Sequence, residues 1–482
     1  METRTAAGTV LVMFALVAVS WSGPAQSLPA ASPVPKTVVL DGGALSSIAS
    51  RFTGGTATAA QRAALEQLRT LADKDAKYGL KNAHVRGGPG TSPHQYYSEA
   101  PYWWPCNHPP DKQPVKKPCT QAPISPACPL GYAYVRYDGY RNPELKSHPD
   151  HLHQVDTWRA VSELSLAWFY ASRLPAGSDG GHATATAYAK HAKRLLHAWF
   201  IDPATAQTAD FAKAQTIPCN SGVRGEGILE ATASLTQLLD ALALLDSGAP
   251  RNGWNDGAAM RAWLTRFRHW MLKSQQGIDE SHQTNNHGSW KALGDAALAL
   301  YLGDAPGAGR IVTERSGKLI PAQIEPDGEQ PLELKRTKPW HYSNYNATAL
   351  CRLAELAAHI PRGLDVWHYA GGTPPSGSLV KAIDYLIPAA ENGDDAWHHK
   401  TTIEPTIDDI RYLAYYELRA AASQADGAAA TAAVDHTPPV LQTPPPAQFQ
   451  TPAPVGSPPP PFERGNLWDV VPDCEILTGS GG

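Results

Sequence analysis

Helical periodicity is the feature that most constrains how this chain can fold. From Ala57 to about Tyr412, apolar residues recur at spacings of three and four, and the alternation typical of strands is scarce. The clearest apolar faces are Leu65, Leu68 and Ala72; Val161, Leu164, Trp168 and Ala171; Leu235, Leu238, Leu242 and Leu245; and Trp263, Phe267, Trp270 and Met271. Further helices are expected at residues 292–302, 347–359, 379–386 and 408–421. The pattern predicts an all-α protein.

Long loops rich in Gly and Pro separate these helices, which fits an array of antiparallel helical hairpins. Closed into a ring, such hairpins form an (α/α) toroid whose loops line a groove at one end. An open solenoid is the alternative, but the sequence has no repeat of fixed period. We therefore predict an (α/α) toroid over residues 57–430, preceded by a lead-in at 26–56.

The two ends of the chain differ from this helical region. Residues 1–25 have the pattern of a secretory signal, with Arg4, an apolar run from Val10 to Val19 and small residues at Gly23 and Ala25. The apolar run is short for a membrane span. Residues 431–482 are rich in Pro and are expected to form an extended, disordered tail. We expect a secreted protein that does not insert into a membrane.

Export affects how the six cysteines are interpreted. Four of them fall in loop-like sequence and are expected to form two disulfides, with three possible pairings: Cys106, Cys119, Cys128 and Cys219. Cys351 lies on an expected helix and is predicted to be a buried thiol, and the state of Cys474 is open. No cysteine pair has the spacing of a zinc site.

Charge and histidine content limit the classes of partner. The formal net charge of −4 argues against a general nucleic-acid binder. An anionic substrate would have to be attracted by a local cluster of charge. His148, His151 and His153 lie close together, but no complementary ligands are evident. We expect no metal, no cofactor and a monomeric protein.

Two segments carry the groups needed to cleave an acidic polysaccharide by β-elimination. One is residues 285–290 (NNHGSW) and the other is residues 332–345 (LELKRTKPWHYSNY). The reaction removes the C5 proton beside a uronate carboxylate, so donors or cations must neutralise that carboxylate. Asn286, His287 and Arg336 are suited to this role, since the planar guanidinium matches a carboxylate.

A base must also take the C5 proton, and an acid must protonate the leaving O4. In glucuronate and mannuronate both groups lie on one face of the ring, so one residue can do both. Tyr342 is the candidate, and Arg336 is expected to favour its phenolate against a reference pKa of about 10. In guluronate the groups lie on opposite faces, and His287 would act as the base. Tyr345, one helical turn away, is the alternative to Tyr342.

Aromatic and polar side chains supply candidate substrate contacts. Tyr97, Tyr102, Trp103 and Trp104 lie in a Pro-rich segment whose aromatic faces could stack on sugar rings. The other candidates are Trp290, Lys338, His341 and Tyr345. Each motif also has a structural interpretation: Asn286 could cap a helix, Arg336 and Lys338 could form a solvated turn, and the aromatic residues could pack internally.

Together these segments resemble the alginate-lyase superfamily of polysaccharide lyases, including its glucuronan-lyase relatives. The matching stretches are residues 97–105, 136–144, 199–203, 285–288, 333–337 and 341–343. The resemblance implies an (α/α) toroid and metal-independent elimination. It also implies that Asn286, His287 and Arg336 attend the carboxylate, that Tyr342 is base and acid, and that Gln215 lies in the groove. The form NNHGSW differs from the NNHSYW of classical alginate lyases, which favours glucuronan or another glucuronate polymer.

The sequence thus predicts a secreted lyase acting on 4-linked uronic-acid polymers. One alternative is a glycoside hydrolase, which needs two carboxylates across the scissile bond; Glu99, Asp138, Glu226 and Glu333 are available. A second is a catalytically silent carbohydrate-binding wall protein. Asn346 begins a glycosylation sequon but follows the proposed catalytic turn, so we expect it to be unmodified.

Overall fold

The computed structural model describes residues 33–82, 92–175, 182–220, 224–249, 252–371, 375–392, 396–399 and 401. Apart from Pro33 these belong to one unit that begins at Val34, and that unit is described below. The expected signal, the helix at 408–421, the Pro-rich tail and Cys474 lie outside the described residues.

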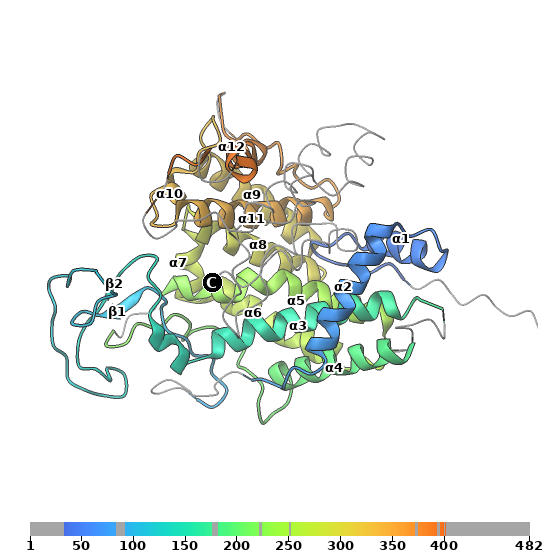
Figure 1. Cartoon of the computed structure of the whole chain (residues 1–482), viewed down its shortest axis with the longest axis horizontal. Coiled ribbons are helices and arrows are strands. Elements are labelled where there is room, and N and C mark those ends of the chain that lie inside the picture. Colours follow the sequence, from blue (N-terminus) through green and yellow to red (C-terminus); the bar gives the residue numbers. More distant parts are fainter. Residues whose placement is uncertain are drawn as a thin grey trace, which may run out of the picture. The chain divides into compact units, whose positions relative to one another are not determined.

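Helices make up most of this unit (Figure 1). They are α1 (Gly42–Thr53), α2 (Ala59–Asp75), α3 (Asp150–Ala171), α4 (His182–Phe200), α5 (Ile228–Gly248), α6 (Gly257–Lys273), α7 (Gln275–Ser281), α8 (Asn286–Tyr301), α9 (Ala305–Gln323), α10 (Pro331–Leu334), α11 (Pro339–Ala358) and α12 (Leu379–Asn392). Single 3-10 turns occur at Pro143–Ser147 and Gly225–Gly227. The described part of the chain confirms the all-α prediction.

The helices form inner and outer rows of an (α/α) toroid, as predicted. Neighbours in space are α4 and α3, α3 and α5, α5 and α8, α8 and α11, and α11 and α12, while α9 packs on α8. The inner helix α8 buries 14 of its 16 residues, whereas α6 buries five of 17 along one stripe. A helix buried on all sides needs apolar or small residues all round, and an outer helix needs only one apolar face.

Helix α5 is long and apolar enough to cross a membrane, and it alone among the described residues passes that test. However, 83% of its apolar window is buried inside the protein. Its hydrophobicity therefore serves the core.

The described part of the lead-in contributes to the core. Val38, Val39 and Leu40 are buried, and their backbone N–H groups donate to the carboxylate of Asp240 on α5. These bonds satisfy backbone donors that would otherwise be buried without partners.

Two helices begin earlier than periodicity predicts, and both changes affect the candidate site. Helix α8 begins at Asn286, because the Asn285 side chain accepts a hydrogen bond from the backbone N–H of His287 (3.1 Å). Asn285 is therefore the cap, and the alternative in which Asn286 caps the helix is wrong. Helix α11 begins at Pro339, in the first turn where proline is tolerated. Tyr342 and Tyr345 thus lie on a helix.

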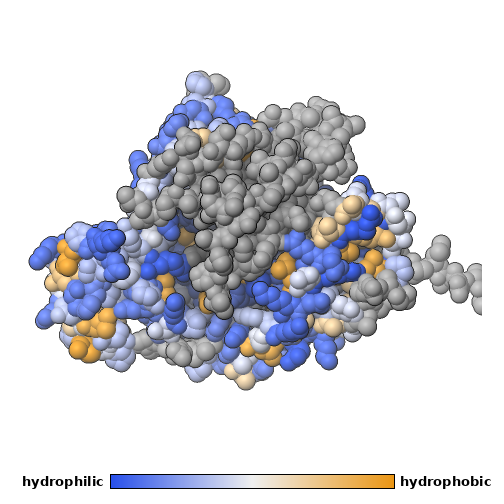
Figure 2. All heavy atoms as spheres, viewed as in Figure 1, coloured by the Kyte–Doolittle hydropathy of each residue, from blue (hydrophilic) through white to orange (hydrophobic). Residues whose placement is uncertain are grey.

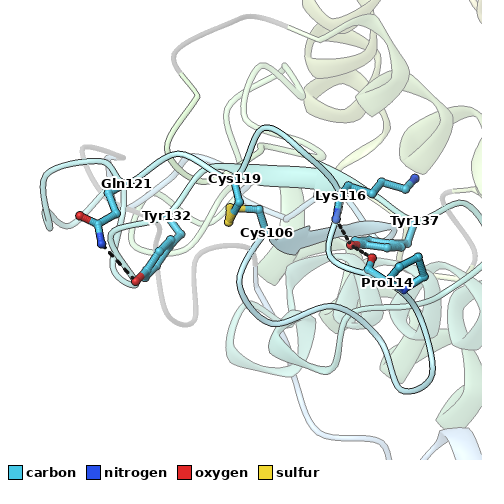
Figure 3. Close-up of a disulfide and its surroundings, with 7 residues drawn as sticks. All are labelled: Cys106, Pro114, Lys116, Cys119, Gln121, Tyr132 and Tyr137. Carbon is cyan, nitrogen blue, oxygen red and sulfur yellow. Dashed lines mark hydrogen bonds between the residues drawn. A yellow bond between two sulfur atoms is a disulfide. The ribbon is translucent and has the colours of Figure 1, made fainter.

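A two-stranded antiparallel sheet interrupts the helices between α2 and α3. Strand β1 (Trp103–Pro105) pairs with β2 (Tyr134–Arg136), with Trp103 opposite Arg136. We call the connecting residues 106–133 the stapled arm, because a disulfide joins Cys106 to Cys119 within it (Figure 3). A second disulfide joins Cys128 to Cys219. The prediction of two disulfides among these four cysteines is confirmed.

Cys351 differs from expectation. It is fully buried on α11, as predicted, but it is disulfide-bonded, so the prediction of a free thiol is wrong. Helical periodicity reports burial and carries no information on a covalent partner.

Candidate active site

Glu333 on α10 holds Asn286 in the first turn of α8. Its carboxylate accepts hydrogen bonds from the Asn286 backbone N–H (2.7 Å) and from Asn286 Nδ2 (2.6 Å). Burial raises the pKa of Glu333, although the Asn286 hydrogen bonds and the charge of Arg336 oppose this. A side-chain amide has two N–H donors, so this contact orients Asn286, which is only 1% exposed, and uses one of the two.

A buried carboxylate also orients His287. The Nδ1 atom of His287 lies 2.6 Å from Oε1 of Glu280, which is on α7 and only 1% exposed. The His287 side chain remains 16% exposed. A carboxylate on one ring nitrogen fixes which nitrogen faces outward, so Nε2 of His287 is available to a ligand.

Asp138, which follows β2, holds Arg336. Nε and Nη2 of Arg336 donate to the two carboxylate oxygens of Asp138 at 3.0 and 2.7 Å, and Thr337 Oγ1 donates at 3.0 Å. Burial would raise the pKa of Asp138, but the hydrogen bonds and charge of Arg336 hold it well below its usual range. This fork-to-fork pairing fixes the plane of the guanidinium.

That plane lies against the ring of Tyr342. The guanidinium carbon of Arg336 is 3.6 Å from the ring centroid, and the Tyr342 hydroxyl donates to the Tyr102 hydroxyl at 2.9 Å. Burial, followed by Tyr102, raises the pKa of Tyr342, and the opposing charge of Arg336 does not cancel the increase. Arg336 thus favours the phenolate as expected, but in this arrangement the neutral phenol prevails.

Aromatic rings continue along α11 beside Tyr342. His341 stacks on Tyr345 with centroids 5.9 Å apart and an interplanar angle of 9°. Burial, with the charges of Lys338 and Arg336, lowers the pKa of His341 to about 4. Trp290 lies 4.8 Å from Tyr345 and is fully buried, so its indole supports Tyr345 from behind. Trp290 therefore packs internally and is not exposed to a substrate.

The aromatic segment before the stapled arm divides into two parts. Tyr102 reaches Tyr342, and Trp103 lies under the guanidinium of Arg224, 5.6 Å from it. Tyr97 is only 5% exposed and donates to Glu99, while Trp104 donates to the backbone oxygen of Tyr140 (2.8 Å). Tyr102 is thus the member of this segment that contacts a candidate catalytic group.

Gln215 adopts a backbone conformation that is uncommon for a residue with a side chain. Its φ is 48°, its N–H donates to Ser98 Oγ (2.8 Å), and its carbonyl accepts from Arg224 (3.1 Å). Outliers of this kind cluster at binding sites. Because Arg224 also lies over the Trp103 ring, its contact with the Gln215 carbonyl places Gln215 near Trp103.

The structure therefore brings together Asn286, His287, Arg336 and Tyr342, and it adds residues that the sequence did not single out for these roles. Glu280 and Asp138 orient His287 and Arg336, and Arg224 covers Trp103. The spacing of Glu280 and His287 gives no signal, since the contact crosses from α7 to α8. Asp138 lay within a motif quoted for the resemblance, but its partner is 198 positions away.

Other predicted features have structural partners of their own. His148 lies 3.4 Å from Glu99, and within the described ranges no group of three metal-ligating side chains is found. Asn346 is fully buried, and its Nδ2 donates to Gln330 (2.8 Å) and Gln323 (3.1 Å). These contacts support the expectation that Asn346 is unmodified.

Comparisons with known proteins identify the family of the chain. A model of the family described as alginate lyase matches residues 79–397. The chain is similar to a crystal structure described as an alginate lyase from Bacteroides ovatus, with 26% identity, a TM-score of 0.68, and coverage of 91% of this chain and 99% of that one. A variant of alginate lyase A1-III matches at 15% identity and a TM-score of 0.44, over 81% of this chain and 89% of that one. No curated protein matches the chain. Because the family model spans well over half of its residues, this chain belongs to the alginate lyase family and is a polysaccharide lyase.

Proposed function

We propose that the protein is a secreted lyase that cleaves 4-linked uronic-acid polymers by β-elimination, with glucuronan as the preferred class. The observation that carries the proposal is the stack of Arg336 on Tyr342, 3.6 Å apart, beside the oriented side chains of Asn286 and His287. This arrangement supplies a carboxylate-binding cation and a proton-transfer group within one small region.

Three donors would neutralise the uronate carboxylate. Asn286 has a second amide N–H, Arg336 keeps Nη1 outside its contact with Asp138, and His287, whose Nδ1 donates to Glu280, has an Nε2–H to donate when the ring is an imidazolium. Donors aimed at the carboxylate stabilise the negative charge that develops when C5 loses its proton. Their carboxylate partners Glu333, Glu280 and Asp138 hold them in place before the substrate arrives.

Tyr342 would carry the proton. Its phenolate oxygen takes the C5 proton, the C4–C5 double bond forms as the C4–O4 bond breaks, and Tyr342 returns the proton to O4. No water is consumed, which distinguishes the reaction from hydrolysis. Because burial raises the pKa of Tyr342, this step is expected to accelerate toward alkaline pH.

The contacts weigh against a hydrolase. Asp138 and Glu333 are engaged by Arg336 and Asn286, Glu226 pairs with Arg224, and Glu99 contacts Tyr97 and His148. A hydrolase needs one carboxyl group to donate a proton and another to face the reacting carbon or a water. None of these four forms such a pair.

Glucuronan is preferred over alginate because of the NNHGSW motif. The similar protein from Bacteroides ovatus is described as an alginate lyase, so alginate is the competing substrate. Secretion is supported by the disulfides Cys106–Cys119 and Cys128–Cys219, which persist in oxidising compartments. We propose that the protein acts as a monomer.

Ultraviolet absorbance of the unsaturated uronate tests the proposal. Purified protein is offered glucuronan, polymannuronate and polyguluronate separately, and glucuronan should give the fastest rise. Arg336→Ala and Tyr342→Phe should each lower kcat by about 10²-fold or more while circular dichroism stays unchanged. New reducing ends without absorbance would establish hydrolysis, and binding without either signal would favour the carbohydrate-binding alternative.

A further inference from the structure

The stapled arm and the strand that follows it carry positive charge that the chain as a whole lacks. Residues 106–137 contain four basic residues and one acidic residue, a formal net charge of +3, whereas the whole chain has −4. The basic residues include Lys112, Lys116 and Lys117, all exposed. Figure 2 shows the mainly hydrophilic surface of this region at the left of the view, with apolar patches at its edge. A local cluster of this sign attracts polyanions despite an unfavourable overall charge.

Several contacts fix the inner part of the arm. The Tyr137 hydroxyl donates to the Pro114 carbonyl (2.8 Å) and accepts from the Lys116 backbone N–H (3.2 Å), as Figure 3 shows. Gln113 Nε2 donates to the Tyr140 hydroxyl (2.9 Å), and the Cys106–Cys119 disulfide closes the loop. These contacts hold residues 113–116 along the segment that leads from β2 to Asp138.

This placement brings Lys116 close to the candidate catalytic arginine. The Lys116 ammonium donates to the Arg136 carbonyl and lies 4.6 Å from the Tyr137 ring centroid. Asp138, which binds Arg336, lies two residues after Arg136. Two residues of extended chain span about 7 Å. Lys116 is therefore within the span of a short oligosaccharide bound at Arg336.

An aromatic surface lies on the same strand pair. Trp103 and Arg136 are directly opposite each other across the β1–β2 ladder, so their side chains project from one face. Arg224 lies above the Trp103 ring, and the Arg136 side chain is 49% exposed and contacts Asp138 (2.7 Å). A sugar chain leaving the cleavage point on this face would meet the Trp103–Arg224 pair and the exposed Arg136 guanidinium.

We propose that the stapled arm is a distal binding site for polyuronate, in which Lys112, Lys116 and Lys117 pair with carboxylates of sugar units beyond the cleaved bond. The proposal rests on the proposed function and identifies how the enzyme would select long anionic chains. Each pairing is exposed and therefore weak and sensitive to salt. Several acting on one polymer add up, because the polymer is already bound at the cleavage point.

The test replaces all three lysines with glutamine (Lys112→Gln, Lys116→Gln and Lys117→Gln). The matched control replaces three exposed lysines on or just after helices α2 and α4: Lys74→Gln, Lys77→Gln and Lys190→Gln. A double variant, Lys112→Gln with Lys117→Gln, leaves the structural contacts of Lys116 intact. Unfolding midpoints of all variants are compared with that of the wild type.

The readout is the ratio of kcat/KM for long glucuronan to kcat/KM for a glucuronate trisaccharide, measured at several salt concentrations. The arm variants should lower this ratio several-fold at low salt and flatten its salt dependence, while the control keeps both. Arm variants that match the control would overturn the proposal. Binding of long glucuronan to the Tyr342→Phe protein, with and without the arm lysines, separates this result from failure of the lyase proposal. If turnover is absent in the wild type but binding still depends on the lysines, only the lyase proposal fails.

Discussion

The two halves of the candidate site are held by carboxylates that come from different distances along the chain. In the α8 half, His287 is oriented by Glu280, seven residues earlier, and Asn286 by Glu333, 47 residues later. The other half, called the α11 half here, consists of Tyr342 on α11 and Arg336, six residues before it. Asp138, which holds Arg336, lies 198 positions away in the chain, beside the stapled arm. The α8 half is therefore held by residues of α7 and α10, whereas the α11 half depends on the segment between α2 and α3.

This difference shows how a cation outside the long helices of a toroid, here the Arg336 guanidinium, can be held in a fixed orientation. The first turn of α8 positions its side chains through capping and neighbouring helices. Arg336 follows the four-residue helix α10 and has no such support. The bidentate carboxylate of Asp138, from another part of the chain, holds the Arg336 guanidinium in place instead. Substitutions at these carboxylates test whether the two halves differ in this way.

The largest effect is expected at Asp138. In Asp138→Asn only one carboxyl oxygen remains as an acceptor, so Arg336 loses the paired contact that fixes its plane on Tyr342. We expect kcat/KM to fall by about 10²-fold to 10³-fold, measured by ultraviolet absorbance. Asp365→Asn, at an exposed aspartate, is the matched control. If the two variants had similar activity, Arg336 would not need Asp138 to hold it in place.

A smaller effect is expected at Glu280. Glu280→Gln keeps the shape of the side chain but removes the charge that fixes the outward nitrogen of His287. We expect kcat to fall by about 10-fold to 100-fold, or about 1.4 to 2.7 kcal/mol in barrier height. His287→Gln provides the comparison. Additive losses in the double variant would contradict the view that Glu280 acts through His287.

Tyr102 should shift the pH dependence. Burial and then Tyr102 raise the pKa of Tyr342. Tyr102→Phe removes the second contribution, so the phenolate forms at lower pH and the rise of kcat/KM should begin at lower pH. The expected change in rate at pH 7 is only a few-fold. A pH profile that coincides with that of the wild type would argue against Tyr342 as the titrating base.

The smallest expected effect is on the pH dependence of folding stability, through Glu99. Burial, with the charge of Glu144, raises the pKa of Glu99 from 4.5 to about 7. The folded state therefore binds more protons than the unfolded state between these values, and stability falls as pH rises through this window. Glu99→Gln should remove this loss, which corresponds to a few degrees in Tm between pH 5 and pH 8, roughly. Thermal melts at both pH values measure it, and equal changes in both proteins would refute the assignment.

The sequence by itself determined the helical architecture, because core burial imposes a period that apolar residues must follow. The faces at Leu65–Ala72 and Leu235–Leu245 fall within α2 and α5. It also brought out Asn286, His287, Arg336 and Tyr342, because their functional groups fit one chemistry. Helix starts were less predictable, since capping by Asn285 and a first-turn Pro339 do not alter apolar periodicity.

Only the tertiary structure decided which groups orient these four residues and which pairs of cysteines are joined. The Asp138–Arg336 pairing and the Cys128–Cys219 disulfide connect segments far apart in sequence. It also decided that Trp290 is buried while Trp103 lies under Arg224. A fully buried and a partly buried tryptophan are the same residue in the sequence, and only tertiary packing distinguishes them. The physical reason is that contacts between distant segments depend on how whole helices and loops pack, and no local pattern records that packing.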